Sequence, residues 1–245
     1  MKDVPSARRL LQRVRNGLRY DGAASVALKL VEKLCSPIVE VGVEVLLVKD
    51  LRAPMIPRMA RVPLEIRIAV EADLPWIVAE LVRQGEPDPD ASRPRDERRL
   101  HEFYLGRLRR GEALFFATVG GELAHLNWTC FSWAEALSGL PLVLANDEVC
   151  TTDAFTTRRW RGNGIHEAVL NEMLRSAAAA GRARAFTLID LDNVRSLRVV
   201  RRLGWATFGV AAYARPRGTT KIFLFRLRGR LDPLLRTLPA IDVSG

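Results

Sequence analysis

Apolar residues along this chain follow two periods, and these predict where strands and helices lie. Alternating or short continuous apolar stretches are typical of strands, because successive strand side chains point to opposite faces of a sheet. Such stretches occur at residues 65–70, 113–119, 122–131, 147–156, 185–189, 205–210 and 221–227. Helical spacing of apolar residues predicts helices at 74–82, 98–108 and 165–180, with another helix after Asn193. The order of these elements predicts a mixed α/β domain.

The residues before this domain are predicted to form a basic extension. A short helix is expected among several arginines, where apolar residues have helical spacing at Leu10, Leu11, Val14 and Leu18. Valine alternates with glutamate over residues 39–45, which favours a strand. Prolines between residues 53 and 63 mark a linker. The sequence therefore predicts three segments, namely an extension and linker (1–60), the main domain (61–230) and a tail (231–245).

The composition narrows the class of protein and of partner. The chain has 245 residues, 48% of them hydrophobic and 27% charged, which suits one globular domain with a short extension. Its formal net charge of +10 favours a polyanionic partner (CoA, nucleic acid or an anionic membrane), although many arginine-rich proteins have none. Nucleic acid is disfavoured, because no binding motif and no aromatic residues interleaved with basic ones are present.

The cysteines and the N-terminal residues indicate in which cellular environment the protein is expected. Cys35, Cys130 and Cys150 are odd in number and fit neither a disulfide framework nor a metal-ligand spacing. We therefore expect a reducing, cytoplasmic environment and no bound metal. The first residues lack the apolar core of a secretory signal, and no apolar run approaches membrane-spanning length. The basic N-terminal helix could still lie on an anionic membrane surface, or it could pack on the main domain.

A glycine-rich turn carries the most specific chemical signal. The stretch Arg161-Gly162-Asn163-Gly164-Ile165-His166 joins a predicted strand to a predicted helix. The first N–H groups of a helix have no intrahelical partner, and glycine lets the backbone come close to an anion. Nearby arginines, including Arg159, add positive charge. The turn predicts a pyrophosphate site, although many such turns only connect a strand to a helix.

Three motifs in this order resemble the GCN5-related N-acetyltransferase superfamily over about residues 64–228. The Gly turn is similar to that superfamily's acyl-CoA pyrophosphate motif. Asn193-Val194-Arg195-Ser196, followed by Leu203-Gly204-Trp205, resembles its second motif, and Ile66-Arg67-Ile68-Ala69, followed by Asp73-Leu74-Pro75, resembles its opening. The resemblance implies an acetyl-CoA donor and a set of donor-binding residues, namely Arg159, Arg161, Gly162, Asn163, Gly164, Ile165, His166 and Asn193.

Two positions depart from the superfamily pattern. His166 stands where the pyrophosphate motif usually ends in glycine or alanine, and it could lie over the phosphates or pack on a neighbouring strand. Val200 stands where many members place a tyrosine that protonates the departing thiolate. The run Asp153-Ala154-Phe155-Thr156 resembles a bacterial subgroup with a short N-terminal extension, some of whose members are associated with cell-surface polysaccharide genes.

The superfamily's chemistry needs a base, because an amine near neutral pH is mostly protonated. Asp153 and Glu148, on the strand before the Gly turn, are candidates, and alternation places them on opposite faces. Asp153 is slightly favoured. Gly120-Gly121 predicts a hairpin between the strands at 113–119 and 122–131. His125, on the second of these strands, is the next candidate, since its ordinary pKa lies near 6.5. For each of the three, a salt bridge or a structural hydrogen bond is the alternative.

We therefore expect an acetyl-CoA-dependent N-acetyltransferase with a GCN5-related α/β fold and an N-terminal helical extension. Its acceptor is expected to be a small primary amine, such as an amino sugar or a cell-surface polysaccharide precursor. Two alternatives remain open: a non-catalytic CoA-binding module of the same fold, and a peripheral membrane enzyme that acylates a lipid-linked amine. The sequence does not determine the oligomeric state.

Overall fold

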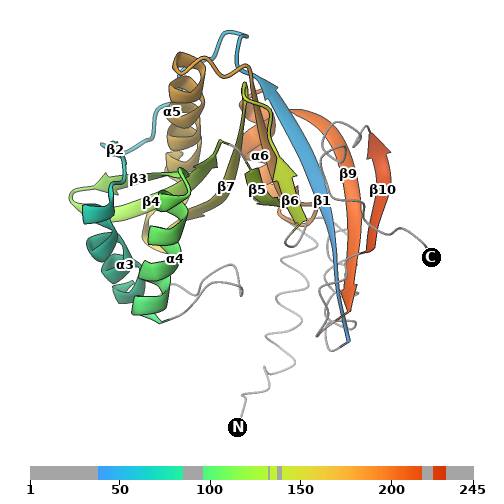
Figure 1. The fold of residues 1–245 in the computed structure, drawn as a ribbon. Helices are drawn as coiled ribbons and strands as arrows, with labels where there is room; N and C mark the ends of the chain where they lie inside the picture. The colour runs from blue at the N-terminus through green and yellow to red at the C-terminus, as the bar shows by residue number, and fades with distance from the viewer. Residues whose placement is uncertain (1–37, 85–95, 132, 137–139, 217–222, 230–245) are drawn as a thin grey trace, which may run out of the picture.

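The computed structural model describes residues 38–84, 96–131, 133–136, 140–216 and 223–229 (Figure 1). The basic N-terminal helix, Cys35 and the tail at 231–245 lie outside these residues, so what was predicted for them stays a prediction.

Within the described residues, one mixed sheet has eight strands in the order β10-β9-β1-β8-β7-β4-β3-β2. Neighbouring strands are antiparallel except β7 and β8, which are parallel. The strands are β1 (Val39–Asp50), β2 (Glu65–Ile68), β3 (Ala113–Val119), β4 (Glu122–Cys130), β7 (Glu148–Thr156), β8 (Arg184–Asp190), β9 (Ala206–Pro216) and β10 (Phe223–Gly229). A separate antiparallel pair consists of β5 (Trp133–Ala136) and β6 (Leu140–Val143). The strands predicted after residue 64 are thereby confirmed.

The strand predicted within the N-terminal extension is a central strand of this sheet. β1 lies between β8 and β9, and its residues pair antiparallel with both neighbours. Val45 and Leu47, on one face of β1, are 2% and 0% exposed. The boundary predicted near residue 60 therefore does not divide the structure. The prediction used local patterns, whereas β1 is placed by pairing with strands more than 130 residues later in the chain.

The helices cover both faces of the sheet. α3 (Leu74–Arg83) and α4 (Glu97–Arg109) lie on one face of β3 and β4, and α5 (Ile165–Ala179) lies on the other (Figure 1). Alternation along β3 produces this arrangement, because Leu114 packs on the α3 side and Phe115 on the α5 side. α6 (Val194–Arg202) packs through Leu197 and Val200 into the core that α5 shares with β1 and β8.

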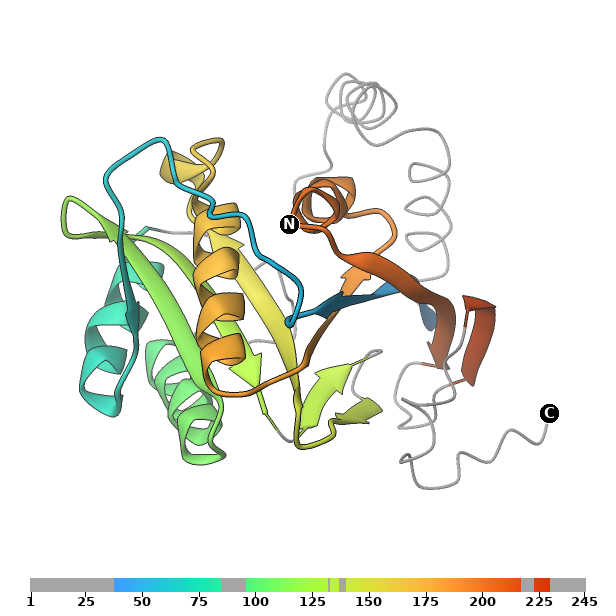
Figure 2. The ribbon, with the colours of Figure 1, turned by 90° about the horizontal axis from the view of Figure 1, so that it is seen from above.

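The segment 51–64, which we call the strap, joins β1 to β2 and crosses α5 (Figure 2). The carbonyl oxygen of Ile56 accepts a hydrogen bond of 3.2 Å from Asn171 of α5. The backbone N–H of Arg61 donates to the carbonyl oxygen of Asn163 at 2.8 Å. The predicted linker is therefore packed against the helix that follows the Gly turn.

The close contact between β1 and β9 allows the position of β1 in the sheet to be tested. Gly42 pairs with Tyr213, and a Cβ atom at Gly42 would lie 2.5 Å from the tyrosine ring. We expect Gly42→Ala to lower the free energy of unfolding by roughly 1–3 kcal/mol, because the Tyr213 ring, 9% exposed, must leave its position against Gly42. Urea denaturation measures this. The matched control is Gly106→Ala in α4, where the nearest side-chain atom lies 3.7 Å away and no loss is expected.

Candidate functional site

The two parallel strands at the centre of the sheet separate part-way along their length. The ladder between β7 and β8 ends at the pair Thr151–Thr187. β7 nevertheless continues to Thr156 and β8 to Asp190, and Figure 2 shows the two strands diverging. Beyond Thr151, the edge of β7 that faces β8 has no ladder partner in that strand. An extended ligand with amide groups can therefore bind along this edge.

A β-bulge lies where the strands separate. The register between β4 and β7 shifts between Leu126, opposite Phe155, and Trp128, opposite Thr152. Asp153, within the bulge, has a φ of 54°, a left-handed conformation that is uncommon for residues other than glycine. A bulge bends its strand. This bend accounts for the divergence of β7 from β8 just after their last pair.

The Gly turn leaves the start of α5 open. Gly162 and Gly164 have φ angles of 85° and 75°, which a residue with a side chain adopts only with strain. No side chain caps α5, whereas Asn193 caps α6 by accepting from the backbone N–H of Ser196. The first N–H groups of α5 therefore remain available to an anion, supported by the helix dipole.

The side chains in and beside the Gly turn form ion pairs and hydrogen bonds with other residues of the protein. Arg159 forms an ion pair with Glu122, in which its Nη1 donates to the two carboxylate oxygens at 2.8 and 2.7 Å. The Nε of Arg161 donates to the carbonyl oxygen of Thr156 at 2.9 Å. Asn163 donates to the carbonyl oxygen of Trp160 at 3.1 Å. These contacts hold the turn in shape, so its backbone N–H groups are better placed than these side chains to bind a phosphate.

His166 and His125 form a stacked pair between α5 and β4. Their ring centroids lie 5.3 Å apart with an interplanar angle of 24°. The Nδ1 of His125 lies 2.8 Å from the Oγ1 of Thr156. Burial, with the neighbouring His166, holds the pKa of His125 well below its ordinary value, and burial lowers the pKa of His166 to about 4. Of the two positions open to His166, the structure has it packed on the neighbouring strand.

Each predicted carboxylate base holds an ion pair. Asp153 pairs with Arg107 of α4, and Glu148 pairs with Arg184 at 2.6 Å. Glu148 also accepts from the backbone N–H of Ala145 at 2.9 Å and lies at the opposite end of β7 from the bulge. The structure therefore brings neither His125 nor Glu148 to Asp153, and all three side chains make structural contacts.

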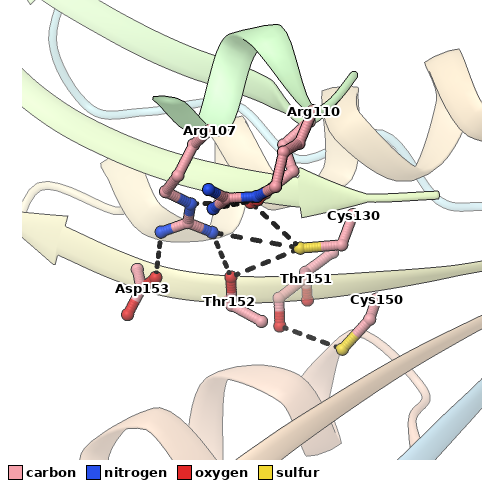
Figure 3. Close-up of polar contacts among 8 residues, drawn as sticks. Arg107, Arg110, Cys130, Cys150, Thr151, Thr152 and Asp153 are labelled. Carbon is pink, nitrogen blue, oxygen red and sulfur yellow. Dashed lines mark hydrogen bonds and ion pairs between the residues drawn. The ribbon is translucent and has the colours of Figure 1, made fainter. Parts of the chain in front are cut away.

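Arg107 and Glu112 are two residues that the sequence reasoning missed. Both are buried, at 6% and 8% exposure, and they form an ion pair of 2.6 Å. Arg107 also pairs with Asp153 (Figure 3). A signal was present, because Leu100, Tyr104 and Arg107 are the buried residues of α4 and follow helical spacing. An arginine on the apolar face of a helix needs buried partners.

Val200 of α6 and Asn193, at the start of this helix, have mainly structural surroundings. Val200 is 2% exposed and packs in the core beneath α6. Because it is a valine, this position has no hydroxyl group that could protonate the departing thiolate. Asn193, which the resemblance implies as a donor-binding residue, caps α6. Within the described ranges, no group of three or more His, Cys, Asp or Glu side chains is arranged to hold a metal ion. None of the described helices has the length and apolar character needed to cross a membrane.

We compared the fold of this chain with solved structures. The crystal structure of a GCN5-related N-acetyltransferase from Sphaerobacter thermophilus matches with a TM-score of 0.53 and 15% identity, over 78% of this chain and 56% of that chain. The chain has the fold of the GCN5-related N-acetyltransferases. It spans little more than half the length of the Sphaerobacter protein. The predicted fold class is confirmed.

Further structures described as acetyltransferases match with lower TM-scores. An acetyltransferase of the GNAT family from Novosphingobium aromaticivorans has a TM-score of 0.49 and 16% identity, over 72% of this chain and 64% of that chain. An acetyltransferase from Clostridium acetobutylicum, solved with acetyl-CoA, has a TM-score of 0.39 and 16% identity, over 59% and 90%. No protein-family model and no curated protein matches the sequence.

Proposed function

We propose that this protein is an acyl-CoA-dependent N-acyltransferase that transfers acetyl from acetyl-CoA to a primary amine. The observation that carries the proposal is the uncapped start of α5 beside the divergence of β7 and β8. The first feature suits a pyrophosphate, and the second suits an extended chain with amide groups that ends in a thioester. The net charge of +10 favours an anionic donor.

In the proposed reaction, the amine nitrogen attacks the thioester carbonyl carbon. A C–N bond forms, the C–S bond breaks, and CoA leaves as the thiolate. A backbone N–H on the β7 edge beyond Thr151 donates to the carbonyl oxygen while negative charge develops on it. The residues of the Gly turn and the first turn of α5 hold the pyrophosphate, with Gly162 and Gly164 allowing its close approach.

Water is assigned the proton transfers in this proposal. Asp153 and Glu148 hold ion pairs, and His125 is 1% exposed with a lowered pKa. Val200 provides no acidic hydrogen. Water therefore takes a proton from the ammonium group of the acceptor, which gives the neutral amine that attacks, and water returns a proton to the departing thiolate. The protein contributes through positioning and through hydrogen bonds to the carbonyl oxygen.

The proposed acceptor is a small amine, such as an amino sugar or a precursor of a surface polysaccharide. The second candidate is a CoA-binding module without catalytic activity, which the valine at position 200 and the paired state of Asp153 favour. Release of free thiol from acetyl-CoA in the presence of a panel of amines distinguishes the two. An enzyme releases thiol with at least one amine, whereas a module binds acetyl-CoA and releases none.

The donor site is tested by Gly164→Val. A side chain at this position must adopt a φ of 75°, and its Cβ would lie 3.7 Å from the carbonyl oxygen of Met59. We expect affinity for acetyl-CoA, measured by calorimetry, to fall by about tenfold or more, which corresponds to about 1.4 kcal/mol. Gly181→Val at the other end of α5 is the matched control, because Gly181 has a φ of 78°. Equal affinities in two folded variants would refute this donor site.

A further inference from the structure

A buried arginine on α4 is bound to the bulge in β7. The guanidinium of Arg107 donates to the carboxylate of Asp153 through Nη1 and to the Oγ1 of Thr152 through Nη2, the latter at 3.1 Å (Figure 3). Its Nε donates to Glu112 at 2.6 Å. The guanidinium also lies over the ring of Trp128, 4.1 Å from its centroid. The arginine is thus held on several sides and has a defined orientation.

The contacts with Thr152 and Asp153 are informative because these residues are adjacent. In a regular strand, successive side chains point to opposite faces of the sheet, so one guanidinium would not reach both. Here both side chains reach Arg107, because the bulge and the left-handed conformation of Asp153 turn them to the same side. The arginine therefore binds the bulged form of β7 and not the regular form.

The charges of this cluster favour the same conclusion. Burial acts to lower the pKa of Arg107, but the carboxylates of Asp153 and Glu112 outweigh burial and raise it, so the guanidinium stays charged. Burial raises the pKa of the Cys130 thiol to about 12, and this thiol donates to Glu112 at 3.4 Å. A buried cation needs paired carboxylates with good geometry. Part of that pairing is available only when Asp153 lies in the bulge.

We propose that Arg107 and Asp153 are a positioning pair that holds the bulge of β7 so that a backbone N–H of this strand points at the donor's carbonyl oxygen. The proposal rests on the proposed acetyl-transfer function and deepens it. The bulge follows Thr152, one residue after the last β7–β8 pair at Thr151. Its direction therefore sets the direction of the β7 edge beyond that pair. Asp153, favoured from the sequence as the base, is assigned a positioning role instead.

The test measures the carbonyl of bound acetyl-CoA in variants that loosen this pair. Asp153→Asn keeps the size of the side chain and tolerates the left-handed conformation, but it removes the charge. Arg107→Lys keeps the charge but removes the planar fork. Arg184→Lys is the matched control, since Arg184 pairs with Glu148 at the other end of β7. Acetyl-CoA carrying ¹³C at the thioester carbonyl is the probe, observed by infrared difference spectroscopy.

In the wild-type protein, a hydrogen bond from β7 should shift the carbonyl band below its position in water. We expect Asp153→Asn and Arg107→Lys to lose most of this shift, while calorimetry shows CoA affinity within about threefold of wild type, since the pyrophosphate site is untouched. The Arg184→Lys control should keep the shift. A variant that only loosens the fold would lower thermal stability without moving the band.

The outcomes separate the two proposals. If wild-type protein does not bind acetyl-CoA, the proposed function fails, and the positioning role fails with it. If wild-type protein binds acetyl-CoA and both variants keep the wild-type band position, the positioning role alone is overturned. Should Arg107→Lys fail to fold, Asp153→Asn decides the question, because it leaves the arginine and its ion pair with Glu112 in place.

Discussion

A protein that begins at Ala60 is expected to lose its folded structure. This truncation removes β1, which pairs with β8 on one side and β9 on the other. The N–H and C=O groups of both neighbours would lose their partners in the middle of the sheet. The core that contains Val45 and Leu47 would lose the side chains that fill it. We expect insoluble protein, or protein without a cooperative thermal transition by circular dichroism.

A second truncation provides the control. A protein that begins at Ile38 keeps all of β1 and the strap, and it should unfold cooperatively and bind acetyl-CoA. The comparison separates loss of the strand from loss of the basic residues before it. A folded, cooperative protein that begins at Ala60 would show that β1 is dispensable, and it would restore the boundary that the sequence suggests.

The sequence predicts helices, strands and turns that are specified by neighbouring residues. It does not predict which strands pair when they lie far apart in the chain. Gly120-Gly121 specifies a hairpin by turn geometry, and Asn193 marks a helix start by its capping side chain. β1 is different. Its alternating valines show that it is a strand, but no residue within it specifies a place between β8 and β9. Prolines in the strap then suggest a linker, although this segment is packed on α5.

In the candidate site, too, features specified by neighbouring residues could be predicted from the sequence, and features that depend on distant residues could not. Positive φ angles at Gly162 and Gly164 are a local requirement, so the Gly turn could be predicted from the sequence. The surroundings of Asp153 could not be predicted, because its partner Arg107 lies 46 residues earlier in the chain and meets it only after α4 packs on the sheet. Strand alternation places Asp153 on one face, and the bulge changes that placement.

Acidification is expected to destabilise this protein through its stacked histidines. Both have a folded-state pKa below the ordinary value of 6.5, and for His166 this pKa is about 4. The unfolded chain therefore binds protons as the pH falls through about 6.5, while the folded protein does not. Their contribution to stability is complete above that pH and is lost as the pH falls toward the folded values. Each such proton makes the free energy of unfolding fall by about 1.4 kcal/mol per pH unit.

Replacing one ring tests this assignment. His166→Phe keeps an aromatic ring against His125 but removes one titrating group, so the slope of stability against pH should decrease by about one proton between roughly pH 6 and pH 5. This window lies above the range in which most carboxylates titrate. Urea unfolding at several pH values gives the slope. Gly106→Ala, on α4, is the control and should leave the slope unchanged, because it removes no titrating group. An unchanged slope in His166→Phe would mean that this ring takes up its proton as readily in the folded protein as in the unfolded chain.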